Sequence, residues 1–218
     1  MESILRSHQV PHFEFVTAVG PEDPGVVETA KLQPQFHLPY IACTESHAKV
    51  WEKIAALPDE EIGLVLEDDV FFHKDWRSLL DQALAELPSD WELFMLDCFY
   101  LQGWDFTSDG NCGRTGIHPA TDCTFGDAYL LRPNSARWLL HRRENVLTEG
   151  GWSNNETLII DLQDRNRSFT YIPKLVLQNF DESDIQTAER TRSTAMFYER
   201  TYFMRFPKKL YQIPERGD

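Results

Sequence analysis

The sequence predicts a single α/β domain with a mostly parallel central sheet flanked by helices. The clearest pattern is strand–helix–strand: an apolar run over 62–66, an amphipathic helix over 75–87 and a second apolar run over 91–97. A crossover of this length favours parallel pairing of the two strands. The 218 residues, 42% of them hydrophobic, suffice for one sizeable core. We therefore expect one domain over 1–218, with 181–218 as a C-terminal extension packed on it.

Before the first apolar run, the chain is predicted to hold three short elements and one long loop. Residues 2–8 have the pattern of a helix end, and 13–17 alternate like a short strand. Residues 18–39 are rich in Gly and Pro, which predicts a loop of the kind that often forms a lid or binding segment. Thr44 is a candidate N-cap for a helix to about Leu57, because the apolar side chains between them share one face.

After the second apolar run, the patterns are weaker. Residues 102–122 lack periodicity and predict a surface loop. A strand pattern over 123–131 contains Gly126, which suggests a bulge or a close approach of a ligand to the backbone. Three further elements are expected, namely a helix from Arg132 to Leu140, a helix over 155–163 and a last strand over 169–177.

Three consecutive carboxylates, Glu67, Asp68 and Asp69, follow the first strand. In an extended chain residues two apart share a face, so Glu67 and Asp69 are expected to point the same way. Two like charges about 4 Å apart repel by roughly 4 kcal/mol at an effective dielectric of about 20, so such a pair faces water, stays partly protonated or holds a cation. Carboxylates suit hard divalent ions such as Mg²⁺ and Mn²⁺. The alternative is a solvated strand end without a ligand.

Charge and composition exclude some classes of partner. The formal net charge of −14 disfavours nucleic acid or an anionic membrane, because both attract clustered positive charge. No run is long enough to predict a transmembrane helix. The amino terminus, residues 1–6, lacks a signal-peptide pattern, which slightly favours a cytoplasmic location.

The four cysteines do not predict a disulfide scaffold. Cys43, Cys98, Cys112 and Cys123 lack the C-x-x-C spacing, which argues against zinc. Cys112 and Cys123 flank a Gly-rich loop and could pair in an oxidising compartment, and four free thiols are the alternative.

Four blocks of sequence follow one another in a characteristic order. They are Ala42–Trp51 with Cys43, Ser46 and His47, Leu64–Val70 with the three acids, Phe125–Leu131, and Ile172 through Gln178 to Ile185. Together these blocks, from about residue 41 to 185, resemble glycosyltransferase family 25, which includes bacterial lipooligosaccharide galactosyltransferases and the collagen galactosyltransferases. The chain departs from that family in two places. It starts just after the position of the family's first strand, and Asp127 stands where a Thr-His pair is more usual.

The resemblance implies a GT-A-like, Rossmann-type fold in which the acidic motif holds Mn²⁺ or Mg²⁺ against the donor diphosphate. It implies Asp69 as the main metal ligand, Glu67 as a second ligand or a partner of the ribose or of a metal-bound water, and Asp68 in the donor site. Ser46 and His47, close to the cap predicted at Thr44, would offer hydrogen bonds to phosphate at a positive helix end, or serve only in capping and packing.

The resemblance also implies inversion at the anomeric carbon, which requires a base for the acceptor hydroxyl. Asp161 is the first candidate and Asp127 the second, and a solvent-facing helix position is the alternative for Asp161. The expected activity is metal-dependent transfer of a hexose, galactose or glucose, from a UDP-sugar to a hydroxyl of a glycan or protein. A catalytically silent family member that binds a sugar or a protein is the alternative, and a metal-dependent phosphohydrolase is a third hypothesis.

Overall fold

The computed structural model describes residues 2–10, 12–32, 36–100, 115–124, 126–149, 153–178 and 210–212. The helices are α1 (Glu2–Ser7), α2 (Pro24–Leu32), α3 (Leu38–Ala55), α4 (Trp76–Glu86), α5 (Pro133–Thr148) and α6 (Asn155–Gln163). The strands are β1 (Gly63–Leu66), β2 (Val70–Phe72), β3 (Leu93–Met95), β4 (Phe99–Tyr100), β5 (Gly116–Pro119), β6 (Cys123–Thr124), β7 (Ala128–Leu131), β8 (Ser168–Ile172) and β9 (Val176–Gln178). Most of the C-terminal extension predicted over 181–218 lies outside the described residues.

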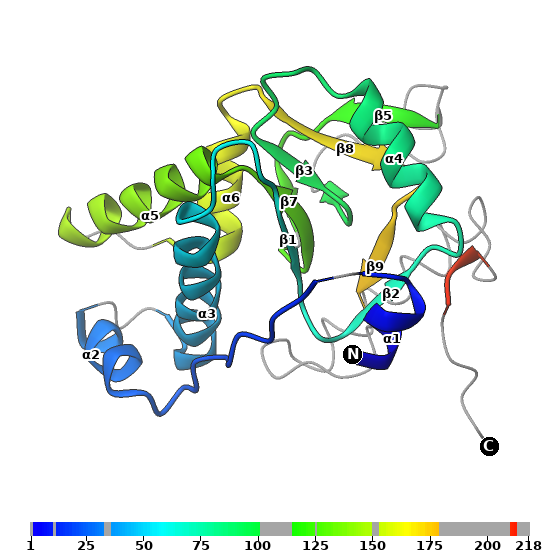
Figure 1. The fold of residues 1–218 in the computed structure, drawn as a ribbon. Helices are drawn as coiled ribbons and strands as arrows, with labels where there is room; N and C mark the ends of the chain where they lie inside the picture. The colour runs from blue at the N-terminus through cyan, green and yellow to red at the C-terminus, as the bar shows by residue number, and fades with distance from the viewer. Residues whose placement is uncertain are drawn as a thin grey trace.

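The main sheet has five strands in the order β1-β7-β3-β8-β5 (Figure 1). Only β3 and β8 pair in parallel, whereas β7 is antiparallel to both of its neighbours and β5 is antiparallel to β8. Two small antiparallel pairs, β2 with β9 and β4 with β6, stand beside this sheet. The α/β class is therefore confirmed, but the expectation of a mostly parallel sheet is wrong, and a Rossmann-type order is not confirmed.

The position of β7 explains why the parallel prediction failed. The crossover through α4 does bring β1 and β3 into the same direction, as expected, because both are antiparallel to β7. The two strands do not pair, however, since β7 lies between them. The chain leaves β3 and later enters β7 at the same edge of the sheet, so β7 has to run the opposite way.

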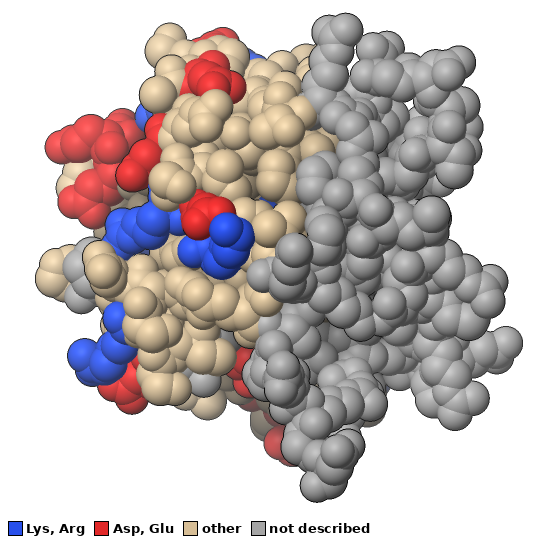
Figure 2. Space-filling view, turned by 90° about the vertical axis from the view of Figure 1, so that its right-hand side faces the viewer, with Lys and Arg blue, Asp and Glu red and all other residues tan. Residues whose placement is uncertain are grey.

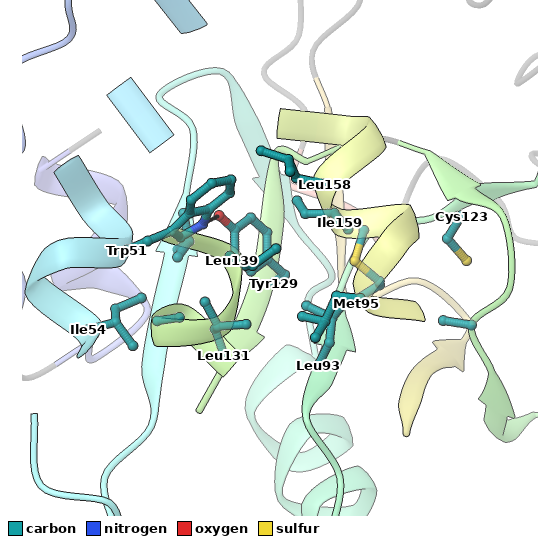
Figure 3. Close-up of a cluster of buried hydrophobic side chains, with 14 of the residues drawn as sticks. Trp51, Ile54, Leu93, Met95, Cys123, Tyr129, Leu131, Leu139, Leu158 and Ile159 are labelled. Atoms are coloured by element: carbon teal, nitrogen blue, oxygen red, sulfur yellow. Dashed lines mark hydrogen bonds between the residues drawn. The ribbon is translucent and has the colours of Figure 1, made fainter. Parts of the chain in front are cut away.

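Helices cover both faces of the sheet (Figure 1). Side chains of α3, α5 and α6 pack on one face against Val65, Met95 and Tyr129, as the close-up in Figure 3 shows in part. Side chains of α4 pack on the other face in a cluster with Phe94 and Leu130. Neighbouring strand residues thus enter opposite cores, as the pleat requires.

Several expected elements differ from the structure. Residues 13–17 form no strand, and the loop expected over 18–39 contains α2. The strand predicted over 123–131 is divided into β6 and β7, so Gly126 and Asp127 lie between two strands. The strand predicted over 169–177 is likewise divided, into β8 and β9. Most of the loop expected over 102–122 lies outside the described residues, and its last part includes β5.

Candidate functional site at the carboxyl ends of β1 and β3

The sheet topology brings acidic residues from separate parts of the chain to one edge. Because β1, β3 and β8 run in the same direction and β7 runs opposite to β1 and β3, the three carboxyl ends and the start of β7 lie at one edge of the sheet. Glu67 follows β1, Asp97 lies just after β3 and Asp127 precedes β7. The backbone closes this edge, since the Glu67 N–H donates to the Asp127 carbonyl at 2.7 Å. In open α/β sheets ligands bind at the carboxyl ends of strands, so this edge is the candidate site.

The acidic motif bends as it leaves β1. The strand ends at Leu66, and Asp68 and Asp69 lie in a turn, so the alternation expected for an extended chain does not reach Asp69. Asp68 is exposed, whereas Asp69 is partly buried. Burial, followed by the negative charge of Glu67, raises the pKa of Asp69 to about 7. The two carboxylates predicted to act together therefore interact electrostatically, although the strand alternation is not the reason.

Gln178 reaches Asp69 from another strand. The register of β2 and β9 sets Gln178 opposite Val70, the residue after Asp69. The Gln178 side-chain amide donates to Asp69 Oδ2 at 3.4 Å. Asp69 Oδ1 and Gln178 Oε1 are both buried and have no hydrogen-bond partner among the described residues. In the sequence, Gln178 is only part of a block that resembles the family, and this contact was not predicted.

Asp127 is the most deeply buried acid that was predicted from the sequence. It is 1% exposed, and neither carboxyl oxygen has a hydrogen-bond partner in the described part of the chain. Burial first, and then the charges of Asp97 and Glu67, raise its pKa well above the usual range, while Lys174 acts in the opposite direction. In the absence of a bound cation, burial therefore shifts this carboxyl toward its neutral form.

Asp97 and Lys174 form a buried ion pair at the same edge. The Lys174 Nζ contacts Asp97 Oδ1, and both side chains are at most 7% exposed. The Gln178 backbone N–H donates to Asp97 Oδ2 at 3.0 Å, which fixes the carboxylate from a second side. Neither Asp97 nor Lys174 was predicted as a site residue. Of these two residues, only Asp97 could have been identified from the sequence, because it lies at the end of a predicted strand.

A chain of hydrogen bonds connects α3 to the acidic motif. The Trp51 indole N–H donates to the Tyr129 hydroxyl at 2.8 Å, in the core shown in Figure 3. The Tyr129 oxygen lies 3.0 Å from His47 Nδ1, and His47 Nε2 lies 3.2 Å from Glu67 Oε1. Burial would lower the pKa of His47, but its interactions with Tyr129, Cys43 and Glu67 outweigh this effect and raise it well above the usual value. His47 thus contacts the acidic motif directly.

Ser46 and Thr44 occupy the middle of a helix. α3 begins at Leu38 with Pro39 in its first turn, so the N-cap predicted at Thr44 is wrong. A phosphate position at the positive helix end near Ser46 and His47 therefore has no support. Ser46 Oγ donates to the Ala42 carbonyl and accepts from the Val19 N–H, both at 2.8 Å. Its contacts join α3 to the segment before α2.

Gly126 lies close to side chains of the protein itself, and the approach of a ligand to its backbone stays a prediction. A Cβ at this residue would lie 3.1 Å from Asn155 Nδ2 and 3.8 Å from His47 Cε1. Asn155 is the first residue of α6, whose N-cap Asn154 accepts from the Thr157 N–H at 2.7 Å. The backbone beside Asp127 is therefore packed directly against the start of α6.

Asp161, the first candidate for the base, lies further along α6. Its Oδ2 accepts from Arg142 Nε of α5 at 2.8 Å, and the side chain is 25% exposed. Six residues separate it from Asn155, which corresponds to about 9 Å along a helix axis. Among the described residues, no hydrogen bond or ion pair joins Asp161 to the acids at the sheet edge. Its role stays a prediction.

A disulfide joins two segments next to the acids. Cys98 pairs with Cys123 at an S–S distance of 2.11 Å. The predicted Cys112–Cys123 pair is therefore wrong, and so is the alternative of four free thiols. Cys112 itself lies outside the described residues. The sequence spacing could not distinguish Cys98 from Cys112 as the partner of Cys123. Cys98 comes directly before β4, and the pairing of β4 with β6 brings it beside Cys123.

Several buried oxygen atoms near this edge are of the chemical type that hard divalent cations bind. Asp69 Oδ1, Gln178 Oε1 and both Asp127 oxygens are buried acceptors that lack hydrogen-bond donors among the described side and main chains. Buried acceptors without donors are costly unless a ligand satisfies them. Carboxylate and amide oxygens are the ligands that Mn²⁺ and Mg²⁺ prefer.

Comparison with known proteins identifies the family of this chain. The model of glycosyltransferase family 25 (LPS biosynthesis protein) matches residues 5–113, which include α3, the acidic motif and Asp97. The chain belongs to glycosyltransferase family 25. No curated protein gave a significant match.

Two further findings concern partners. None of the described helices is both long and apolar enough to cross a membrane. On the face shown in Figure 2, the described Lys and Arg side chains lie beside Asp and Glu side chains rather than in a separate basic patch. Elsewhere among the described residues, the ion pairs Arg142–Asp161 and Arg143–Glu45 also join opposite charges.

Proposed function

We propose that this chain is a metal-dependent, inverting hexosyltransferase. It transfers a hexose, galactose or glucose, from a UDP-sugar to a hydroxyl group of a glycan or protein. Membership of glycosyltransferase family 25 supports sugar transfer as the class of reaction. The donor, the acceptor, the metal and the stereochemical outcome are parts of the proposal.

The observation that carries the proposal is the group of unsatisfied acceptors at the sheet edge. Asp69, Asp127 and Gln178 each have at least one buried oxygen without a donor in the described part of the structure. We assign Asp69 as the principal ligand of Mn²⁺ or Mg²⁺ and Glu67 as a further ligand or a partner of the ribose. The bound metal would neutralise charge on the leaving diphosphate, which is the main electrostatic requirement of the reaction.

The buried ion pair supports a positioning role for the residues behind this group. Asp97 is held by Lys174 and by the Gln178 backbone, so its charge is compensated. Asp127 next to it has no such partner among the described groups. A cation near Asp127 would favour its ionised form, whereas burial in the metal-free protein acts in the opposite direction and raises its pKa. These differences support Asp127, rather than Asp97, as a group that acts on a ligand.

The base is the least constrained part of the mechanism. A general base must come within hydrogen-bond reach of the acceptor hydroxyl. Asp127 belongs to the sheet edge with Asp69, whereas Asp161 accepts from Arg142 on a different side of α6 from the residues that enter the core. We therefore prefer Asp127 as the residue whose carboxylate the reaction needs and keep Asp161 as the alternative.

The test is donor turnover. The chain is incubated with UDP-galactose or UDP-glucose and Mn²⁺, with and without candidate acceptors, and released UDP is measured. We expect release that requires the metal and that Asp69→Asn abolishes. Asp81→Asn is the matched control, because it makes the same change at an exposed residue of α4. Equal release by Asp69→Asn and the parent chain would contradict the proposal.

A catalytically silent member that only binds a nucleotide sugar is the second candidate. The engagement of Asp161 by Arg142 favours it, since the first candidate for the base is already occupied. Metal-dependent binding of UDP without any UDP release from either donor, at any acceptor, would favour this second function. Release of inorganic phosphate would instead indicate a phosphohydrolase.

A further inference from the structure

We propose that Cys43, His47 and Glu67 form a second metal site, for Zn²⁺ or a cation of similar softness. It is distinct from the hard-cation site proposed at Asp69. The three ligand atoms, one sulfur, one ring nitrogen and one carboxylate oxygen, all lie within 4.8 Å of one another. They are the three ligand types that bind Zn²⁺ in proteins.

The spacing of the ligand atoms suits one ion. His47 Nε2 and Glu67 Oε1 are 3.2 Å apart. Two ligands bound to Zn²⁺ at about 2.0–2.2 Å in tetrahedral geometry are separated by about 3.3 Å. The two atoms therefore already stand near the distance that a shared ion would impose.

The helix presents two of the ligands together. Cys43 and His47 are four residues apart within α3, so they lie one above the other on the same face. Both are well inside the helix bounds, Leu38–Ala55. Glu67 approaches from the end of β1, and an ion at this position would join α3 to the acidic motif.

The surroundings of His47 fix its orientation. Its Nδ1 lies 3.0 Å from the Tyr129 hydroxyl, which in turn accepts from the Trp51 indole N–H. A histidine that binds metal through one nitrogen commonly has its other nitrogen held in this way. The contact holds the ring so that Nε2 points toward Glu67.

Charge and chemistry distinguish this site from the one at Asp69. Binding releases the Cys43 proton, and the resulting thiolate together with the Glu67 carboxylate balances the charge of a divalent ion. Thiolate and imidazole favour Zn²⁺ and Co²⁺ over Mn²⁺ and Mg²⁺. Glu67 Oε1 faces His47, which leaves its second oxygen for the hard-cation site. The inference goes beyond the proposed transferase activity and does not depend on it.

The test uses Co²⁺ as a coloured substitute for Zn²⁺. The full chain is freed of metal with a chelator, kept anaerobic without added thiol, and titrated with Co²⁺ while the near-ultraviolet sulfur-to-cobalt absorption is recorded. We expect this absorption to reach a plateau at one equivalent and to be reversed by Zn²⁺. Cys43→Ser should abolish the absorption and weaken Zn²⁺ binding at least about a hundredfold.

Two variants serve as controls. Cys112→Ser should keep the absorption, which shows that the thiolate is that of Cys43. Asp69→Asn should also keep it, which separates this site from the donor site. Absence of the absorption in the parent chain, or its survival in Cys43→Ser, would overturn the proposal. Because the assay contains neither UDP nor Mn²⁺, that failure would leave the transferase proposal untouched.

Discussion

The backbone N–H of Glu67 donates to the carbonyl of Asp127 at 2.7 Å, and this bond joins the end of β1 to the segment before β7. Two acids that are far apart in the sequence thereby reach the same sheet edge. Their charges interact, since Glu67 contributes to the raised pKa of Asp127. The candidate site thus depends on β7, which lies between β1 and β3 and is antiparallel to both.

Replacing Asp127 with asparagine should stabilise the metal-free protein at neutral pH. The pKa of Asp127 is higher in the folded state than in the unfolded chain, so the folded protein binds the proton of this carboxyl more tightly. This contribution to stability is complete below the unfolded pKa of about 3.9 and is lost as the pH rises toward the higher folded pKa. We expect Asp127→Asn to increase the free energy of unfolding by about 1–3 kcal/mol at pH 7, and less at pH 4.

The measurement is urea denaturation in the presence of a chelator at both pH values. The same variant should lose most UDP release, since the carboxylate that is costly to bury is the one the reaction needs. A variant that is less stable than the parent at pH 7 would contradict the assignment of Asp127 as a carboxyl with a raised pKa.

Replacing Tyr129 with phenylalanine should destabilise the fold. The Tyr129 hydroxyl accepts from Trp51 and contacts His47, so its removal leaves two buried polar groups without this partner. We expect a loss of about 1–3 kcal/mol in the free energy of unfolding, measured by urea denaturation.

Tyr171→Phe is the matched control for that experiment. The Tyr171 ring is 1% exposed, but its hydroxyl has no hydrogen-bond partner among the described residues. Its removal should cost little or stabilise the protein. Equal destabilisation by the two variants would show that the chain from Trp51 to Glu67 is energetically unimportant.

Loss of the Cys98–Cys123 disulfide should lower stability. The bond closes a loop with a sequence separation of 25 residues, for which chain entropy predicts about 3.5 kcal/mol. We expect Cys98→Ala to lower the midpoint of denaturation under non-reducing conditions, whereas Cys112→Ser should not. Alkylation of Cys98 and Cys123 in the unreduced, unfolded chain would show that the pair is not formed.

Asp161→Asn should change donor turnover little. Its carboxylate is engaged by Arg142, and its place along α6 separates it from the start of the helix beside Gly126. We expect UDP release within about threefold of the parent chain, compared with a loss of about 100-fold or more for Asp127→Asn. A large loss in Asp161→Asn alone would restore it as the base.

Sequence patterns predicted best the helices, which are recognised from neighbouring residues. The bounds of α6 agree with the prediction, and α4 with its preceding Asp75 nearly so, because helical spacing and adjacent turn residues are read from neighbouring positions. The start of α3 was missed because Pro39 was taken as part of a loop, although proline is favoured in the first turn of a helix.

The site could be predicted only in part, because several of its residues are brought together by pairing between strands that are distant in the sequence. The acids after β1 were found because they follow a clear apolar run. The contributions of Lys174 and Gln178 depend on how β8 and β9 are placed beside β3 and β2, and no spacing in the sequence encodes that. The grouping of Cys43 with His47 and Glu67 was missed for the same reason, since a search for C-x-x-C spacing cannot detect ligands from a helix and a strand end.

The central claim is that the carboxylates at the sheet edge bind a divalent cation together with the donor's diphosphate. Calorimetric titration of UDP into the chain, with and without Mn²⁺, tests it most directly, with Asp69→Asn and Asp81→Asn measured in parallel. The account predicts UDP binding that requires Mn²⁺, persists in Asp81→Asn and is lost in Asp69→Asn. Binding of UDP that is equally strong without Mn²⁺, or equally strong in Asp69→Asn, would contradict it.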